Sequence, residues 1–135
     1  MIARVAVLLA AVAAIAWFAT GLHAADLEQR GNNVRATQAD RFSIPRAEQA
    51  SRYYERARRF NPDTRPILLE ANLLSFFRAG NARAFRLAKE VTHREPANVT
   101  AWAIVAGLAD RLDPPMAARA RRRIRELSPP VPPAR

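Results

Sequence analysis

Three stretches with a common pattern decide how the chain folds: ASRYYERARRFNP (Ala50–Pro62), AFRLAKEVTHREP (Ala84–Pro96) and AARARRRIRELSP (Ala117–Pro129). Each begins with alanine and ends with proline, and the closing prolines lie 34 and then 33 residues apart. Within each stretch, small or apolar residues recur at intervals of three or four, the spacing of one helical face. Three copies at a matching interval favour a helical repeat over an ordinary alanine-rich helical bundle, which is the alternative.

The rest of the chain is predicted to be helical as well. No stretch alternates apolar and polar residues as a half-buried strand does. Turn residues fall at regular intervals and include proline, which fits the first turn of a helix, and asparagine and aspartate, which cap exposed N–H groups. These breaks predict helices over about 46–60, 65–79, 82–94, 98–110 and 114–127, and a sixth over about 26–41 that continues from the N-terminal segment.

The pattern resembles the second helix of a tetratricopeptide-repeat (TPR) unit, whose signature is A-x3-F, a small residue and then proline at a 34-residue period. Trp102 and the small residues that follow it resemble the first helix of such a unit. The resemblance covers about residues 46–129 and implies antiparallel helical hairpins stacked into a short right-handed α-solenoid, with alanine where two helices cross. The residues that it assigns to repeat packing are Ala50, Tyr54, Ala57, Pro62, Ala84, Ala88, Val91, Pro96, Trp102 and Ile124.

The segment before Ala50 does not resemble the first helix of a unit. It contains Asn33-Val34-Arg35-Ala36-Thr37, which offers few apolar side chains for packing. We therefore expect two units preceded by a solitary helix of the second type. The expected parts of the chain are a transmembrane anchor or signal peptide over 1–25, a linker or degenerate helix over 26–45, a TPR-like domain over 46–129 and a proline-rich disordered tail over 130–135.

The N-terminal segment carries no charged residue from Val5 to Ala25, which matches the roughly 20 residues that a membrane-spanning helix needs. Trp17 and His23 lie near its far end, where amphipathic rings suit the membrane–water boundary. We expect an uncleaved single-pass anchor; a cleaved signal peptide and a buried soluble helix are the alternatives. We expect the following domain to lie outside the cytoplasm, although Arg30, Arg35 and Arg41 favour the opposite orientation.

The composition argues against catalysis. The chain has no cysteine, which excludes thiol catalysis and cysteine-ligated metals. Glycine occurs four times and forms no phosphate-binding loop. The two histidines, His23 and His93, are not expected to act in catalysis or bind a metal, and the pair that His93 forms with Glu90 three residues before it is most simply a surface contact. We expect a non-catalytic protein that holds no metal or cofactor.

Two features of the predicted helices are candidate partner surfaces. Leu69, Leu73 and Phe76 form an i, i+4, i+7 stripe that would either line an apolar groove or be buried. A basic patch on the last helix would either bind an acidic protein or lipid or be a solvated capping face. No aromatic residue is interleaved with its arginines, so nucleic acid is not an expected partner. The patch consists of Arg119, Arg121, Arg122, Arg123 and Arg125.

The charge of the whole chain is strongly positive, with a formal net charge of +10, and Lys89 is the only lysine among its 22 basic residues. Together these features predict a membrane-anchored scaffold that mediates protein–protein interaction. The alternative is an accessory subunit of a membrane complex, with an arginine-rich face that binds anionic lipid or an acidic partner. The sequence does not identify the protein partner.

Overall fold

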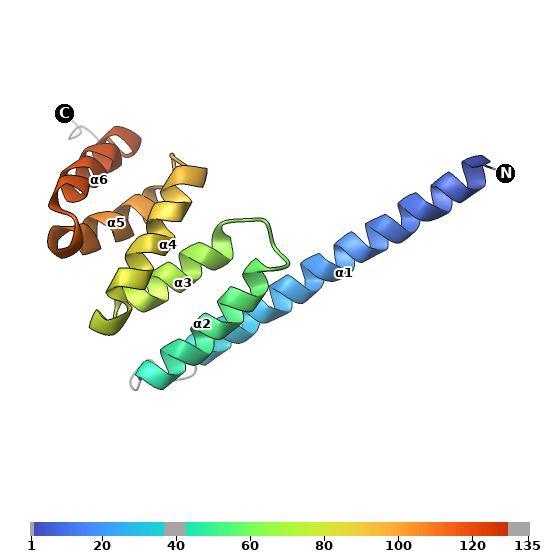
Figure 1. The fold of residues 1–135 in the computed structure, drawn as a ribbon, viewed down its shortest axis with the longest axis horizontal. Helices are drawn as coiled ribbons and strands as arrows, with labels where there is room; N and C mark the ends of the chain where they lie inside the picture. The colour runs from blue at the N-terminus through green and yellow to red at the C-terminus, as the bar shows by residue number, and fades with distance from the viewer. Residues whose placement is uncertain (1, 37–42, 130–135) are drawn as a thin grey trace, which may run out of the picture. The chain divides into compact units, whose positions relative to one another are not determined.

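A computed structural model describes residues 2–36 and 43–129, and its regular elements within these ranges are all helices (Figure 1). Within the described residues the prediction of an all-helical protein is confirmed, and the five helices predicted after residue 45 are present with ends shifted by up to four residues. The predicted helix over 26–41 is present to Ala36, and its predicted end lies outside the described residues. Residues 37–42 and the predicted proline-rich tail, 130–135, lie outside the described residues. The helices are α1 (Ile2–Ala36), α2 (Ile44–Arg58), α3 (Arg65–Ser75), α4 (Asn81–Arg94), α5 (Val99–Leu112) and α6 (Pro114–Leu127), with a short 3-10 turn over Arg78–Gly80.

The chain divides into two compact units, Met1–Pro66 and Ile67–Arg135. The first unit contains α1 and α2, and the second contains α4, α5, α6 and most of α3. This division differs from the predicted domain over 46–129, because α2 packs with α1.

Side-chain caps start the last two helices. Asn98 Oδ1 accepts a hydrogen bond of 3.0 Å from the backbone N–H of Ala101 before α5, and Asp113 Oδ1 accepts one of 3.2 Å from Met116 before α6. Such caps satisfy N–H groups that the first turn of a helix leaves free. Because caps are local in sequence, these helix starts were predictable from the residues alone.

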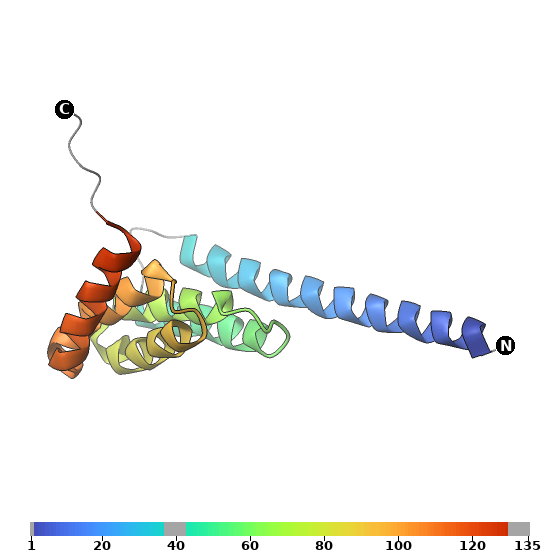
Figure 2. The same cartoon turned by 90° about the horizontal axis from the view of Figure 1, so that it is seen from above.

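In the first unit, the C-terminal part of α1 forms an antiparallel hairpin with α2 (Figures 1 and 2). The Tyr54 ring lies against Gly31, and the Phe60 ring, just beyond the end of α2, meets the His23 ring with centroids 4.9 Å apart. A Cβ atom at position 31 would lie 2.6 Å from Tyr54 Cε1. Glycine therefore permits this close approach of α2 to α1.

Polar contacts add to the packing of this hairpin. The Tyr54 hydroxyl donates a hydrogen bond of 2.9 Å to Asn32 Oδ1, and Asn61 Nδ2 donates one of 3.1 Å to Glu28 Oε1. Residues 26–36, predicted as a linker or as a degenerate helix that continues from the N-terminal segment, do continue α1 without a break, and they pack against α2. The expectation that α2 is solitary is wrong, because the end of α1 packs against it through the buried Ala24, Leu27 and Gly31 together with these polar pairs.

The second unit is built around one apolar cluster to which α3, α4, α5 and α6 all contribute. Trp102 on α5 is its largest member and is 6% exposed. Fully buried alanines such as Ala84 and Ala88 let neighbouring helices approach closely. At the side of the cluster, the buried Glu70 carboxylate on α3 forms an ion pair of 2.5 Å with Arg83 on α4. This core is small and rich in alanine, as the composition predicts.

Burial of the predicted packing residues follows the helical pattern. Ile124 is partly buried at the edge of the apolar cluster, and Pro62 and Pro96 are exposed because they lie beyond the ends of α2 and α4. The stacking of the hairpins into a solenoid stays a prediction. The fully or almost fully buried members are Ala50, Tyr54, Ala57, Ala84, Ala88, Val91 and Trp102.

The N-terminal part of α1 has no described residue packed over its apolar side chains. Every side chain from Arg4 to His23 is exposed, and the large apolar ones from Val7 to Leu22 are 63–71% exposed. At about 1.5 Å per residue, the charge-free run from Val5 to Ala25 extends about 31 Å, close to the ~30 Å hydrocarbon core of a bilayer. The helix is therefore long and apolar enough to span a membrane.

Candidate functional site: an arginine-lined cleft between α4 and α6

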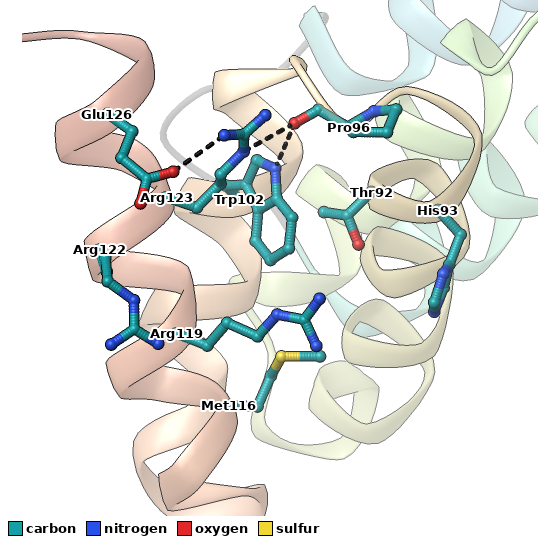
Figure 3. Close-up of a pocket in the computed structure, with 9 residues that line it drawn as sticks. All are labelled: Thr92, His93, Pro96, Trp102, Met116, Arg119, Arg122, Arg123 and Glu126. Atoms are coloured by element: carbon teal, nitrogen blue, oxygen red, sulfur yellow. Dashed lines mark hydrogen bonds and ion pairs between the residues drawn. The ribbon is translucent and has the colours of Figure 1, made fainter.

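The second unit has a cleft of about 450 Å³ between the end of α4, the start of α5 and the outer face of α6 (Figure 3). Its floor is apolar and its rim is basic, a combination that suits a polar or charged ligand with an aliphatic stem. We name it the α4–α6 cleft. Its lining residues are Thr92, His93, Pro96, Trp102, Met116, Arg119, Arg122, Arg123 and Glu126.

One backbone carbonyl organises the upper end of the α4–α6 cleft. The Pro96 oxygen accepts a hydrogen bond of 2.9 Å from Trp102 Nε1 and a longer one of 3.4 Å from Arg123 Nε. Arg123 Nη1 also donates to Glu126 Oε2 at 2.8 Å on the same helix. Figure 3 shows Trp102 and Arg123 meeting at the Pro96 oxygen, and Arg123 also reaching Glu126. Arg123 is therefore held in place, and its charge is offset by Glu126.

The two other arginines of the cleft, Arg119 and Arg122, are exposed. Within residues 2–36 and 43–129, neither forms an ion pair with a carboxylate. Figure 3 shows Arg119 extending from α6 toward the α4 side of the cleft, close to Met116. With Arg123 and Glu126 offsetting each other, these two guanidinium groups give the cleft a formal charge of +2. The cleft is thus positively charged and suited to carboxylates, which guanidinium groups bind in bidentate geometry.

The remaining arginines of the predicted basic patch do not line this cleft. Arg121 reaches across to α5, where its Nη2 contacts Asp110 Oδ2 at 2.5 Å, and Arg125 is exposed elsewhere on α6. Residues three and four apart share a helical face, whereas positions two apart do not. The five arginines predicted as one patch are therefore distributed over more than one face of α6.

The predicted apolar stripe does not form an exposed groove. Leu73 is fully buried, Leu69 is partly buried and Phe76 is 69% exposed. The stripe assumed a helix that continues to residue 79, but α3 ends at Ser75, so Phe76 leaves the helical face. This candidate surface is withdrawn for that reason.

The described residues contain no group of three or more His, Asp or Glu side chains that could hold a metal ion. His93 lies on the exposed rim of the α4–α6 cleft, and His23 lies in the first unit against Phe60. The Thr92 hydroxyl donates to the Lys89 carbonyl at 2.8 Å.

Sequence analysis found the arginines of the cleft but not its apolar floor. Trp102 was assigned to packing, and Met116 was not singled out. The available signal was the spacing of Arg119, Arg122 and Arg123, which places one subset of the arginines on a single helical face.

The comparisons with known proteins give no match: no protein-family model matches the chain, and neither a curated protein nor a solved structure is similar to it. The resemblance to TPR units therefore rests on the residues of the chain alone.

Proposed function

We propose that this chain is a membrane-anchored, TPR-like scaffold without catalytic activity, and that it holds an acidic segment of a partner protein in the α4–α6 cleft. The observation that carries the proposal is the pair Arg119 and Arg122, two exposed guanidinium groups without a carboxylate partner among the described residues, beside an apolar floor.

The anchor in this proposal is the N-terminal part of α1. A core helix of a soluble protein would be mostly buried, but these apolar side chains are exposed. Ala24 at the end of the charge-free run is buried, and His23 contacts Phe60. Removal of the run as a signal peptide would delete these packing contacts, which favours an uncleaved anchor. We propose that the folded part lies outside the cytoplasm.

Alkaline carbonate extraction of native membranes tests the anchor, combined with mass spectrometry of the N-terminus. The proposal expects an intact chain in the membrane pellet. An intact chain in the soluble fraction, or a chain that begins near Ala25, would contradict it. Protease accessibility in sealed vesicles tests the orientation, because an extracytoplasmic domain is protected only when the vesicle encloses the extracytoplasmic face.

The TPR-like part of the proposal rests on the repeated pattern and on its burial. The leading alanines Ala50 and Ala84 are both fully buried, and Ala117 is 2% exposed. α1 with α2, and α5 with α6, pack as neighbours along the chain. TPR units bind peptides and partner domains, which is the reason to expect a protein ligand.

The chemistry of the α4–α6 cleft indicates what kind of segment it takes. Arg119 and Arg122 provide planar donors for Asp or Glu carboxylates. Trp102 and Met116 provide an apolar floor against which the methylene groups of a Glu side chain can pack. Exposed ion pairs contribute roughly 0.2–1 kcal/mol each, so binding through the two arginines is weak to moderate and sensitive to salt.

The test is titration of a labelled oligoglutamate peptide with the full-length protein in zwitterionic detergent micelles, followed by fluorescence polarisation. The double variant Arg119→Gln/Arg122→Gln is expected to weaken binding by about tenfold, which corresponds to ~1.4 kcal/mol. The matched control is Arg86→Gln/Arg125→Gln, which removes the same charge from exposed positions outside the lining of the cleft.

Equal loss in the two double variants would mean that the peptide responds to net charge alone and would contradict a site in the cleft. If the protein does not bind the peptide but binds anionic vesicles through Arg119 and Arg122, the result supports the alternative, an accessory subunit that faces lipid, and contradicts the scaffold.

A further inference from the structure

A second arginine-lined hollow, of about 520 Å³, lies within the first unit, between α1 and α2. It is placed where the charge-free run of α1 ends and the packed part of the helix begins. We name it the α1–α2 hollow. Its lining residues are His23, Asp26, Leu27, Arg30, Tyr53, Arg56, Arg59 and Phe60.

The position of the hollow along α1 fixes its depth relative to the exposed apolar segment. Val5 to Leu22 extends about 27 Å at 1.5 Å per residue, nearly the thickness of a hydrocarbon core. His23 and Asp26 then lie about 1.5 and 6 Å beyond Leu22, within the roughly 5–7 Å headgroup layer on one side of a bilayer. The hollow therefore opens at headgroup level when the segment spans a membrane.

Contacts within the hairpin bring the end of α2 to the same level. The Phe60 ring meets the His23 ring edge to face at 4.9 Å, and Phe60 is 43% exposed. Arg59 precedes Phe60, and Arg56 lies one helical turn away. Tyrosine, whose ring carries a polar hydroxyl at one edge, is enriched at this boundary, and Tyr53 lines the hollow.

The hollow carries net positive charge. Asp26 Oδ2 accepts a hydrogen bond of 2.8 Å from Arg30 Nε, so that pair is neutral. Arg56 and Arg59 form no ion pair among the described residues, which leaves two unneutralised guanidinium groups. Asp26 is the one carboxylate in the lining, and Arg30 offsets it.

We propose that the α1–α2 hollow binds the phosphate headgroup of an anionic phospholipid through Arg56 and Arg59. The proposal rests on the membrane anchoring proposed above, and it uses residues different from those of the α4–α6 cleft. A lipid phosphate at this depth meets both guanidinium groups while its acyl chains lie along the apolar side chains of α1. The hollow thus fixes the depth of the anchor as well as its lipid environment.

The experiment compares lipid retention by the full-length protein purified in mild detergent with phosphatidylglycerol or phosphatidylcholine and measured by native mass spectrometry. The protein is expected to retain phosphatidylglycerol in preference to phosphatidylcholine. The Arg56→Gln/Arg59→Gln variant should lose at least tenfold in retention, since an arginine near an anionic surface contributes on the order of a fivefold gain in affinity. The matched control is Arg46→Gln/Arg52→Gln, on the same helix but outside the lining of the hollow.

Equal phosphatidylglycerol retention by the two double variants would overturn the proposal. Displacement of the lipid by glycerol phosphate at equimolar concentration would also overturn it, because the hollow would then take a free phosphate and not a lipid. Carbonate extraction of the same variants keeps the two proposals apart. Release of every variant from membranes refutes the anchor, whereas retention in membranes with unchanged lipid selectivity refutes the headgroup site alone.

Discussion

The hairpin α1–α2 and the helices of the second unit both bury alanines, but they differ in what surrounds those alanines. In the hairpin, the large buried side chain is Tyr54, which lies against Gly31 and needs a hydrogen-bond acceptor on α1. In the second unit, the buried side chains form one apolar cluster, and the indole of Trp102 is satisfied by a backbone carbonyl.

Because of this difference, we expect the stability of the two units to respond to different kinds of substitution. The hairpin buries Leu27 and several alanines around one close approach and a few polar pairs, so adding a single atom at that approach changes its packing. The second unit spreads its stability over many apolar contacts, so it responds mainly to the loss of a large side chain. Hydrogen exchange, measured by mass spectrometry on the full-length protein in detergent, reports the local stability of each unit separately.

The largest expected effect is in the second unit. Replacing Trp102 with Ala should lower the free energy of unfolding by about 3–5 kcal/mol, because it leaves a cavity and removes the hydrogen bond to Pro96. Amides of α4, α5 and α6 should exchange faster, while those of α2 stay unchanged. Trp17→Ala is the control, since Trp17 is 71% exposed and should leave exchange in both units unchanged. Equal acceleration in both units would remove the distinction drawn between them.

The second effect is specific to the hairpin. Gly31→Ala should destabilise α1–α2 by about 1–2 kcal/mol, because overpacking against Tyr54 outweighs the gain of up to ~1 kcal/mol from replacing glycine within a helix. Gly107→Ala on α5 is the matched control with the opposite expected sign. A Cβ atom there meets no other atom within 4 Å, so stability should rise by about 0.5–1 kcal/mol. Thermal unfolding followed by circular dichroism measures both, and a gain in stability at position 31 would refute the close contact.

A third effect concerns alkaline pH. Burial of the ring raises the pKa of the Tyr54 phenol above its ordinary value of 10.0; Arg35 opposes this rise and Glu28 adds to it. An unfolded chain loses the proton at about pH 10 and the folded chain only at higher pH. The resulting stabilisation is fully present below pH 10 and is lost as the pH rises through the folded-state pKa.

Tyr54→Phe should therefore cost about 0.5–1.5 kcal/mol below pH 10, through loss of the hydrogen bond to Asn32, and the difference from the wild-type chain should shrink above that pH. The measurement is the unfolding midpoint as a function of pH, with Tyr53→Phe as the control. A difference that is constant from neutral to strongly alkaline pH would contradict the burial of the phenol.

The smallest effect belongs to the exposed contact between α5 and α6. Asp110→Asn removes the partner of Arg121 but should change the free energy of unfolding by less than about 1 kcal/mol, because both side chains are half exposed and screened by water. A loss as large as that expected for Gly31→Ala, measured by the same unfolding experiment, would show that polar pairs matter as much in the second unit as in the first.

The candidate site was only partly predictable. The sequence identified the arginines of α6, but it did not show that Arg121 reaches Asp110 while Arg119 and Arg122 lie in the α4–α6 cleft. The apolar stripe was open between an exposed groove and a buried face, and the end of α3 at Ser75 divides it, since Leu73 is buried and Phe76 is exposed. The end of a helix is harder to predict from a sequence than its start, because proline and capping side chains mark the start.

The sequence by itself determined the helices, their starts and the apolar length of α1, because periodicity, caps and hydrophobicity are properties of neighbouring residues. Only the tertiary structure decided that α2 packs against the polar, glycine-containing end of α1. The Tyr54 ring packs against Gly31, where a larger residue would clash with it. The two residues are 23 positions apart in the sequence, so a local sequence pattern does not predict this contact. The same holds for the two arginine-lined hollows, whose walls come from helices that meet only after folding.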